Sequence, residues 1–163
     1  MCGVFGYVGA ETDVGATVLS ALKTLEYRGY DSWGVAVAAA DGMMVEKEPG
    51  RINGVHKPFP RSRSGLGHTR WATHGGVTAE NAHPHVDEAG RIAVVHNGII
   101  ENHAVLKAEL LARGHTFRSE TDSEVVVHLV EEALNQGESL AQAVSSVFAR
   151  LEGYNAVVVL DRA

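Results

Sequence analysis

Residues 1–10 read MCGVFGYVGA, a short apolar run punctuated by glycines, and they hold the only cysteine of the chain, Cys2. The run from residue 3 to residue 8 predicts a buried strand that ends at Gly9. Chain ends usually fray, so a residue placed there gains little from packing. The position of Cys2 therefore raises the question of a chemical role.

Removal of Met1, which a small second residue permits, would leave Cys2 with a free α-amine beside its thiol. The two groups would form a base and a nucleophile, as in hydrolases that use an N-terminal threonine. The alternative is that Cys2 is a small buried apolar residue, as free cysteines often are. Position alone does not decide between the two interpretations.

Composition bounds the class of protein. With 163 residues, of which 45% are hydrophobic and 21% charged, the chain is typical of one soluble globular domain. The net charge is −6 and no basic stripe exists, so we expect no nucleic-acid partner. The longest apolar runs fall well short of the roughly 20 residues of a membrane span, and no signal segment opens the chain. We therefore expect no membrane association, a cytoplasmic location and no disulfide framework.

The first half of the chain predicts a helix, a hairpin and a loop. Apolar spacing predicts a helix over residues 13–27, with Asp13 as its cap. Residues 33–39 and 43–47 flank Asp41-Gly42, a dipeptide typical of a type I′ turn, and predict antiparallel strands. Residues 48–65 carry three of the four prolines and predict a loop.

The second half predicts further strands over residues 66–72, 91–96 and 156–161, and a helix over residues 102–113 that ends at Gly114. Two more helices follow Thr121 and Ser139, which match the capping-box spacing with Glu124 and Gln142. Strands at both ends, with a hairpin and grouped helices between them, indicate a layered α+β fold.

Two short motifs carry candidate catalytic and binding groups. In HNG, residues 96–98, the Asn97 amide and the Gly98 N–H could stabilise an oxyanion; the alternative is an ordinary Asn-Gly turn. In GHTRWATHGG, residues 67–76, Arg70 offers a planar fork for a carboxylate. Trp71 could form a lid, and Thr73 and His74 could donate hydrogen bonds.

In SETDSE, residues 119–124, Asp122 could accept a ligand ammonium group, or it could complement the dipole of the helix that it begins. Together with Arg70 it would recognise an α-amino acid. Nine histidines raise a metal alternative, in which His83, His85 and Asp87 hold zinc. No second cluster with ligand spacing accompanies them, so we expect no metal.

Six motifs in this order, MCGVFGYVG, LEYRGYDS, GHTRWATHG, NAHPH, VVHNGIIEN and SETDSE, identify a resemblance. The chain resembles the N-terminal glutaminase domain of the glutamine–fructose-6-phosphate aminotransferases, or glucosamine-6-phosphate synthases. These are class II, N-terminal-nucleophile glutamine amidotransferases. The resemblance covers essentially the whole chain.

The resemblance implies a four-layer αββα sandwich of the N-terminal-nucleophile hydrolase type, with no metal and no cofactor at the glutaminase site. It implies that Cys2 attacks the carboxamide of L-glutamine, forms a thioester and releases ammonia. It also implies that Asn97 and Gly98 form the oxyanion hole and that Arg70 and Asp122 bind the α-carboxylate and α-ammonium groups of the substrate. Thr73 and His74 would contact the ligand from a mobile loop. Trp71 would gate the passage of ammonia, and Arg28 would support the surroundings of the nucleophile.

The chain departs from the resemblance in three places. Trp33 stands where the family has a small residue, and its indole would either crowd the glutamine pocket or fill a gap. The loop over residues 51–65 is shortened. The chain ends at Ala163, so we expect residues 1–163 to be a glutaminase domain that lacks its C-terminal strands and the sugar-phosphate isomerase domains. The sheet edge left open would favour a homo-oligomer.

Such a chain could not by itself aminate fructose 6-phosphate. We expect its ammonia to serve a synthase or isomerase domain, or a partner chain. The alternative from another class is a catalytically silent glutamine-binding module that serves regulation or assembly. The joint presence of Cys2, Arg70, Asn97, Gly98 and Asp122 favours the enzyme, because a silent module needs no nucleophile and oxyanion hole together.

Overall fold

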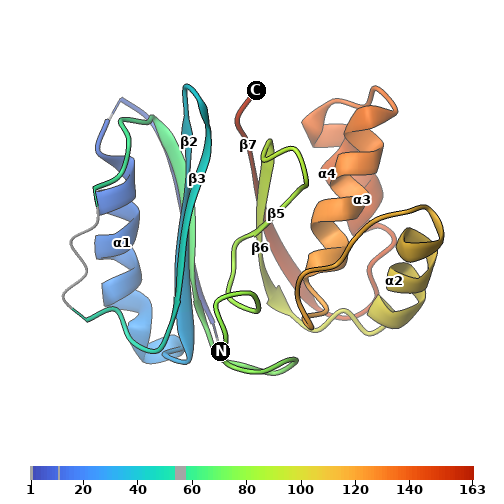
Figure 1. Cartoon of the computed structure of the whole chain (residues 1–163), viewed down its shortest axis with the longest axis horizontal. Coiled ribbons are helices and arrows are strands. Elements are labelled where there is room, and N and C mark those ends of the chain that lie inside the picture. The colour runs from blue at the N-terminus through green and yellow to red at the C-terminus, as the bar shows by residue number, and fades with distance from the viewer. Residues whose placement is uncertain (1, 11, 54–57) are drawn as a thin grey trace.

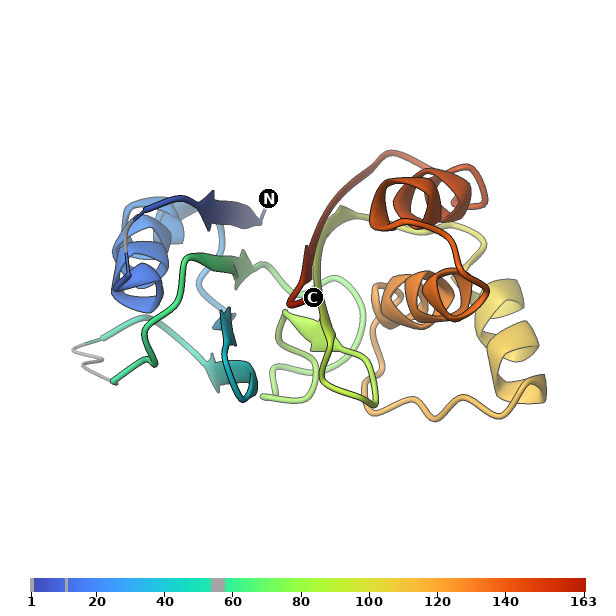
Figure 2. The ribbon, with the colours of Figure 1, turned by 90° about the horizontal axis from the view of Figure 1, so that it is seen from above.

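The computed structural model describes residues 2–10, 12–53 and 58–163. Two antiparallel sheets pack face to face, and each is covered by helices on its outer side (Figure 1). Seen from above, α1 (Val14–Leu25) lies on one flank and the other helices on the opposite flank (Figure 2). The predicted four-layer αββα sandwich is confirmed.

The first sheet contains β1 (Gly3–Val8), β2 (Ser32–Ala39), β3 (Gly42–Pro49) and β4 (Ser64–Arg70), in the order β1-β4-β2-β3. Helix α1 continues into a short 3₁₀ turn, η1 (Glu26–Arg28). Gly3 pairs with Thr69, so the start of β1 lies beside the end of β4. This register brings Cys2 next to the motif that follows β4.

The second sheet contains β5 (His85–Val86), β6 (Ile92–Gly98) and β7 (Asn155–Asp161), in the order β5-β6-β7. Its outer face is covered by α3 (Glu124–Asn135) and α4 (Leu140–Phe148), and α2 (His103–Ala112) packs against α3 (Figure 2). The two-residue strand β5 was not predicted, because a segment so short shows no periodicity. None of the described helices is long and apolar enough to cross a membrane.

Three apolar cores hold the layers together. Val18, Leu22 and Trp33 belong to the core between α1 and the first sheet. Small and medium side chains, among them Ala36 and Leu66, fill the space between the two sheets. Trp33 is 1% exposed, and the indole therefore fills a gap in the α1 core rather than crowding a ligand pocket.

Several local predictions are confirmed and others are wrong. Ser139 and Gln142 form the predicted capping box of α4, and Gly114 follows α2 with a φ of +95°. The β2–β3 turn falls on Ala40 and Asp41, and no non-glycine residue described has a positive φ, so the type I′ turn at Asp41-Gly42 is wrong. The loop prediction holds for the described residues between β3 and β4, while residues 54–57 and Met1 lie outside the described residues.

Two predicted caps also fail. Asp13 occupies the N-cap position of α1, but its side chain accepts no capping hydrogen bond. Helix α3 begins at Glu124 rather than at Asp122. The Glu124 carboxylate accepts hydrogen bonds from the backbone N–H groups of Arg118 (2.8 Å) and Ser119 (2.7 Å), which leaves no capping box at Thr121.

Candidate active site

A pocket of about 560 Å³ lies at the end of the sandwich where the chain begins. Six of the residues predicted from the sequence line it: Cys2, Arg28, Trp71, Thr73, Asn97 and Gly98. Ile99, Glu101 and Tyr154 complete the lining and were not predicted. Segments that adjoin both sheets thus contribute to one hollow: Cys2 precedes β1, Trp71 follows β4, and Asn97 and Gly98 end β6.

Cys2 is held at both its side chain and its backbone. Its Sγ accepts a hydrogen bond from the Trp71 N–H at 3.2 Å. Its carbonyl oxygen accepts from Arg28 Nε at 3.3 Å and from Asn97 Nδ2 at 3.2 Å. Three segments far apart in the sequence therefore fix the first described residue, which counters the fraying expected of a chain end.

The orientation of the Asn97 amide is set by His68, a residue that the sequence did not single out. His68 Nε2 lies 2.9 Å from Asn97 Oδ1 and 3.1 Å from the carbonyl oxygen of His96. Both partners are acceptors, so Nε2 carries the proton and Nδ2 of Asn97 is left to face Cys2. Burial lowers the pKa of His68 to about 4, and the ring is neutral near pH 7.

Gly98 cannot be replaced by a residue with a side chain without disturbing the pocket wall. Its φ is +133°, and a Cβ built there would lie 2.3 Å from the carbonyl oxygen of Tyr154. Only glycine satisfies both constraints. Glycine therefore lets the end of β6 lie close to the backbone before β7, next to Asn97.

Arg70 lies behind the pocket rather than in its lining. It is 3% exposed, and its guanidinium donates hydrogen bonds to the carbonyl oxygens of Gly76 (3.0 Å) and His74. Burial lowers the pKa of Arg70, while the nearby carboxylates of Asp31 and Asp122 act in the opposite direction. The Arg70 guanidinium thus binds the backbone of the loop that follows β4.

Asp122 is also buried outside the pocket lining. It is 3% exposed, and its Oδ2 accepts a hydrogen bond from the Ile100 N–H at 2.8 Å. This bond ties the segment before α3 to the chain that leaves β6. Both predicted clamp residues therefore have protein hydrogen-bond partners, and the charge of Asp122 acts on Arg70.

The loop after β4 presents its side chains at the rim. Trp71 is 46% exposed and packs its ring edge-on against Tyr30, with ring centroids 5.5 Å apart. The His74 ring packs against His103 at 5.4 Å, and its Nδ1 lies 3.4 Å from Thr73 Oγ1. Trp71 and Thr73 line the pocket, whereas His74 lies beside it.

The histidines proposed for a metal are part of the interior. His83 and His85 are each 4% exposed, and their rings pack against one another at 4.6 Å. His85 Nε2 lies 2.9 Å from Thr121 Oγ1. Asp87 accepts hydrogen bonds from the backbone N–H groups of Arg91 and Ile92, so its carboxylate closes the β5–β6 turn.

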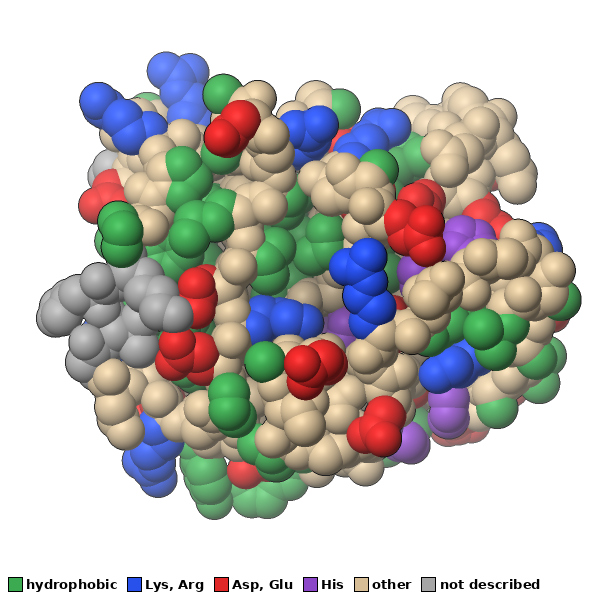
Figure 3. Space-filling view, viewed as in Figure 1, with side chains coloured by type: hydrophobic (Ala, Val, Ile, Leu, Met, Phe, Trp, Pro, Cys, Tyr) green, Lys and Arg blue, Asp and Glu red, His purple; other side chains and the backbone are tan. Residues whose placement is uncertain are grey.

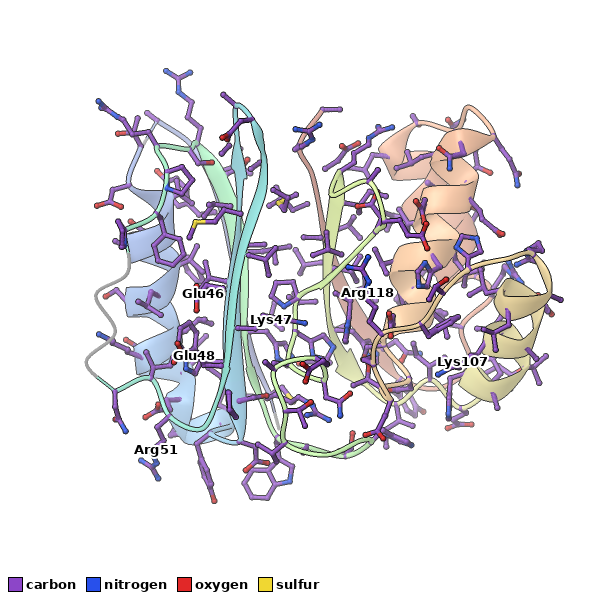
Figure 4. All side chains as sticks on the ribbon, viewed as in Figure 1. Glu46, Lys47, Glu48, Arg51, Lys107 and Arg118 are labelled. Atoms are coloured by element: carbon purple, nitrogen blue, oxygen red, sulfur yellow. The ribbon has the colours of Figure 1, made fainter. Side chains whose placement is uncertain are left out.

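A second hollow, of about 570 Å³, is lined by none of the predicted glutaminase residues, although His85 and Asp87 of the metal alternative border it. Figure 4 shows Lys47 on the side of the first sheet and Arg118 on the side of the second. The Lys47 ammonium donates to the carbonyl oxygen of Ala82 at 2.9 Å, and burial lowers the pKa of Lys47. The hollow is therefore separate from the pocket that holds Cys2.

The sequence profile described as "Glutamine amidotransferase domain" matches residues 53–162. The chain belongs to this family. Among curated relatives, the glutamine–fructose-6-phosphate aminotransferase [isomerizing] of Streptomyces coelicolor is 54% identical over 158 residues, covering 94% of this chain. The enzyme of that name from Thermus thermophilus is 50% identical over 165 residues, covering 98% of this chain. This amidotransferase domain spans only 26% of the length of either relative.

Two solved structures share the fold. The glutamine phosphoribosylpyrophosphate amidotransferase of B. subtilis superposes with a TM-score of 0.81 at 24% identity, covering 99% of this chain and 35% of that one. A structure titled as the allosteric regulatory enzyme of purine biosynthesis gives a TM-score of 0.84 at 25% identity, covering 99% and 36%. Both comparisons support the four-layer arrangement of this amidotransferase domain.

Proposed function

We propose that this domain hydrolyses L-glutamine to L-glutamate and ammonia, with the Cys2 thiol as nucleophile. The observation that carries the proposal is the meeting of Cys2 and Asn97 in one pocket. Asn97 Nδ2 lies 3.2 Å from the Cys2 carbonyl oxygen although the two residues are 95 positions apart. A nucleophile beside an amide donor is the arrangement that acyl transfer requires.

The reaction needs Met1 to be removed, so that the α-amine of Cys2 acts as general base. The amine takes the thiol proton while sulfur adds to the carboxamide carbon of glutamine. The oxygen that gains negative charge is stabilised by Asn97 Nδ2 and the Gly98 N–H. The proton then passes to the departing nitrogen, which leaves as ammonia. Water adds to the thioester, glutamate leaves and the thiol is restored.

Recognition of the α-carboxylate and α-ammonium groups is assigned to Arg70 and Asp122. Both are buried behind the pocket, and the Arg70 fork is bound to the loop carbonyls of His74 and Gly76. A glutamine carboxylate would have to replace these carbonyls, which requires the loop over residues 73–76 to move. Thr73 and His74 would then contact the substrate as the loop closes over it.

The ammonia is proposed to serve a synthase or isomerase domain of a longer protein, or a partner chain. The support is that the part that matches is only 26% of the length of the curated relatives, which are named as aminotransferases. Trp71 lies half-exposed at the rim of the pocket, where a gate for ammonia would have to stand.

The test is glutamate production by the Met1-processed domain and its variants. Cys2→Ala should abolish turnover, and Asn97→Ala should lower kcat by about 10²–10³-fold. Asn135→Ala, which removes an exposed asparagine from the end of α3, should leave kcat unchanged. Turnover that persists in Cys2→Ala would contradict the proposal. Glutamine binding without turnover in the processed protein would favour the silent module.

A further inference from the structure

Two histidines and a glutamate converge on the helical side of the molecule, away from the pocket that holds Cys2. His128 and Glu131 lie three residues apart on α3 and so share one face. His115 approaches from the segment that joins α2 to α3. His128 Nδ1 is 3.6 Å and His115 Nδ1 is 3.8 Å from Glu131 Oε2. Figure 3 shows histidine and acidic side chains next to one another on this flank.

The central atoms of this cluster lack hydrogen-bond partners within the described part of the chain. His128 is 2% exposed, and neither of its ring nitrogens makes a hydrogen bond. Glu131 Oε2 is likewise buried without one. Leaving such groups unsatisfied costs free energy, so the arrangement calls for a ligand that all three side chains can bind.

A carboxylate lies behind each ring, and the one behind His115 is close enough to orient that ring. His115 Nε2 lies 3.0 Å from Glu132 Oε1, which places the proton on Nε2 and a lone pair on Nδ1. His128 Nε2 faces Glu124 Oε1 at 3.8 Å. A carboxylate that accepts from the outer ring N–H is common around histidines that ligate metals, and His115 has this contact with Glu132.

We propose that His115, His128 and Glu131 bind one divalent first-row transition metal ion, of which Zn²⁺ is the best match. One ligand atom from each residue lies within 4.8 Å of the others. Donors of a tetrahedral zinc site lie roughly 3.3 Å apart, given metal–ligand distances of about 2.0–2.2 Å. Small side-chain movements therefore suffice, and water would take the fourth position. Two imidazoles do not suit Mg²⁺ or Ca²⁺, which prefer oxygen ligands.

The ion would fasten the segment between α2 and α3 to α3 itself. The same segment carries Glu120, whose carboxylate accepts hydrogen bonds from Asn81 Nδ2 (3.1 Å) and the Gly76 N–H (3.2 Å). None of the three ligands lines the pocket that holds Cys2. The metal is thus assigned a structural role, independent of glutamine chemistry.

The test is Zn²⁺ titration of the chelator-treated chain in competition with a chromophoric chelator. The chain carries Cys2→Ala, so that the thiol does not bind the ion. We expect one equivalent to bind, Co²⁺ to give the visible spectrum of a four-coordinate site, and saturating Zn²⁺ to raise Tm. Glu131→Gln and His115→Gln should each weaken Zn²⁺ binding at least tenfold and lower the rise in Tm at the same Zn²⁺ concentration. His103→Gln, a histidine outside the cluster, should match the parent.

Two outcomes would overturn the metal site. One is uptake of less than a tenth of an equivalent of Zn²⁺ by the folded parent chain. The other is the same affinity in Glu131→Gln and the parent, with circular dichroism showing both to be folded. If Zn²⁺ fails to bind while Glu131→Gln changes the pH dependence of unfolding, the cluster is a buried His–Glu pair that shares a proton and the proposal is wrong.

Discussion

His68 Nε2 lies 2.9 Å from Asn97 Oδ1, and this contact turns the Asn97 amide nitrogen toward Cys2. If the Asn97 amide flipped, its Nδ2 group would face the N–H of His68 Nε2, and two hydrogen-bond donors would lie against each other. The side chain predicted to stabilise the oxyanion is therefore held by a histidine on the other sheet. Fixing a donor before the reaction is what makes it effective in stabilising developing charge.

Replacement of His68 tests this relationship. His68→Leu removes the donor and should lower kcat about tenfold or more while KM for glutamine changes little, because the misplaced amide affects the transition state. His68→Gln keeps a donor and should recover part of kcat. Equal losses in the two folded variants, or a change confined to KM, would contradict a positioning role for His68.

Arg70→Lys tests the proposed clamp. Lysine keeps the charge but cannot form the two-pronged contact with a carboxylate, so KM for glutamine should rise at least tenfold. Steady-state kinetics of glutamate formation would measure the change. Exposed Arg113→Lys, at the end of α2, is the matched control and should behave as the parent. An unchanged KM in Arg70→Lys would remove Arg70 from the clamp.

Acid should destabilise the domain below about pH 6.5. Burial lowers the pKa of His68 to about 4 and that of His85 to about 3, and it lowers the pKa of His83 well below its usual value. The unfolded chain binds protons at these sites at higher pH than the folded chain does. The free energy of unfolding should therefore fall as the pH drops from 6.5 toward 4, by roughly 3 kcal/mol for His68 alone.

Urea unfolding at a series of pH values would measure this fall through the midpoint concentration. His68→Gln should show a shallower dependence than the parent, because one buried neutral histidine is gone. A free energy of unfolding that is constant between pH 7 and pH 4.5 would contradict the account of these three residues.

The capping box of α4 gives a stability prediction that is separate from activity. Ser139 Oγ accepts a hydrogen bond from the Gln142 N–H, and Gln142 Oε1 accepts from the Ser139 N–H at 3.0 Å. Ser139→Ala should cost about 1 kcal/mol of unfolding free energy. Ser146→Ala, within the same helix, should cost less, and glutaminase activity should be unchanged in both. Equal Tm values for the parent and Ser139→Ala would contradict the capping contribution.

The sequence predicted features that depend on residues close together in the chain. It missed features that depend on contacts between segments or on the register of paired strands. The Ser139–Gln142 box is correct because both partners lie within one helical turn. The matching spacing at Thr121–Glu124 fails, because the Glu124 carboxylate is occupied by two upstream N–H groups. The β2–β3 turn shifts by one residue from Asp41-Gly42, since the register is set by the whole strand pair.

The residues of the candidate site also fall into those that local motifs identify and those whose role depends on tertiary contacts. Cys2, Asn97 and Gly98 were identified from short motifs, and the structure brings them into one pocket. His68 was missed although it lies within a quoted motif, because its role appears only when β4 and β6 face each other. The burial of Arg70 and Asp122 behind the pocket could not be deduced either, since it depends on the path of the loop after β4.

The central claim is that Cys2, freed of Met1, is a working nucleophile. The most direct test is the intact mass of the protein before and after exposure to an electrophilic glutamine analogue. We predict a starting mass that lacks Met1, one adduct per chain, and no adduct in Cys2→Ala. A processed chain that never acquires the adduct, or an adduct that persists in Cys2→Ala, would contradict the account.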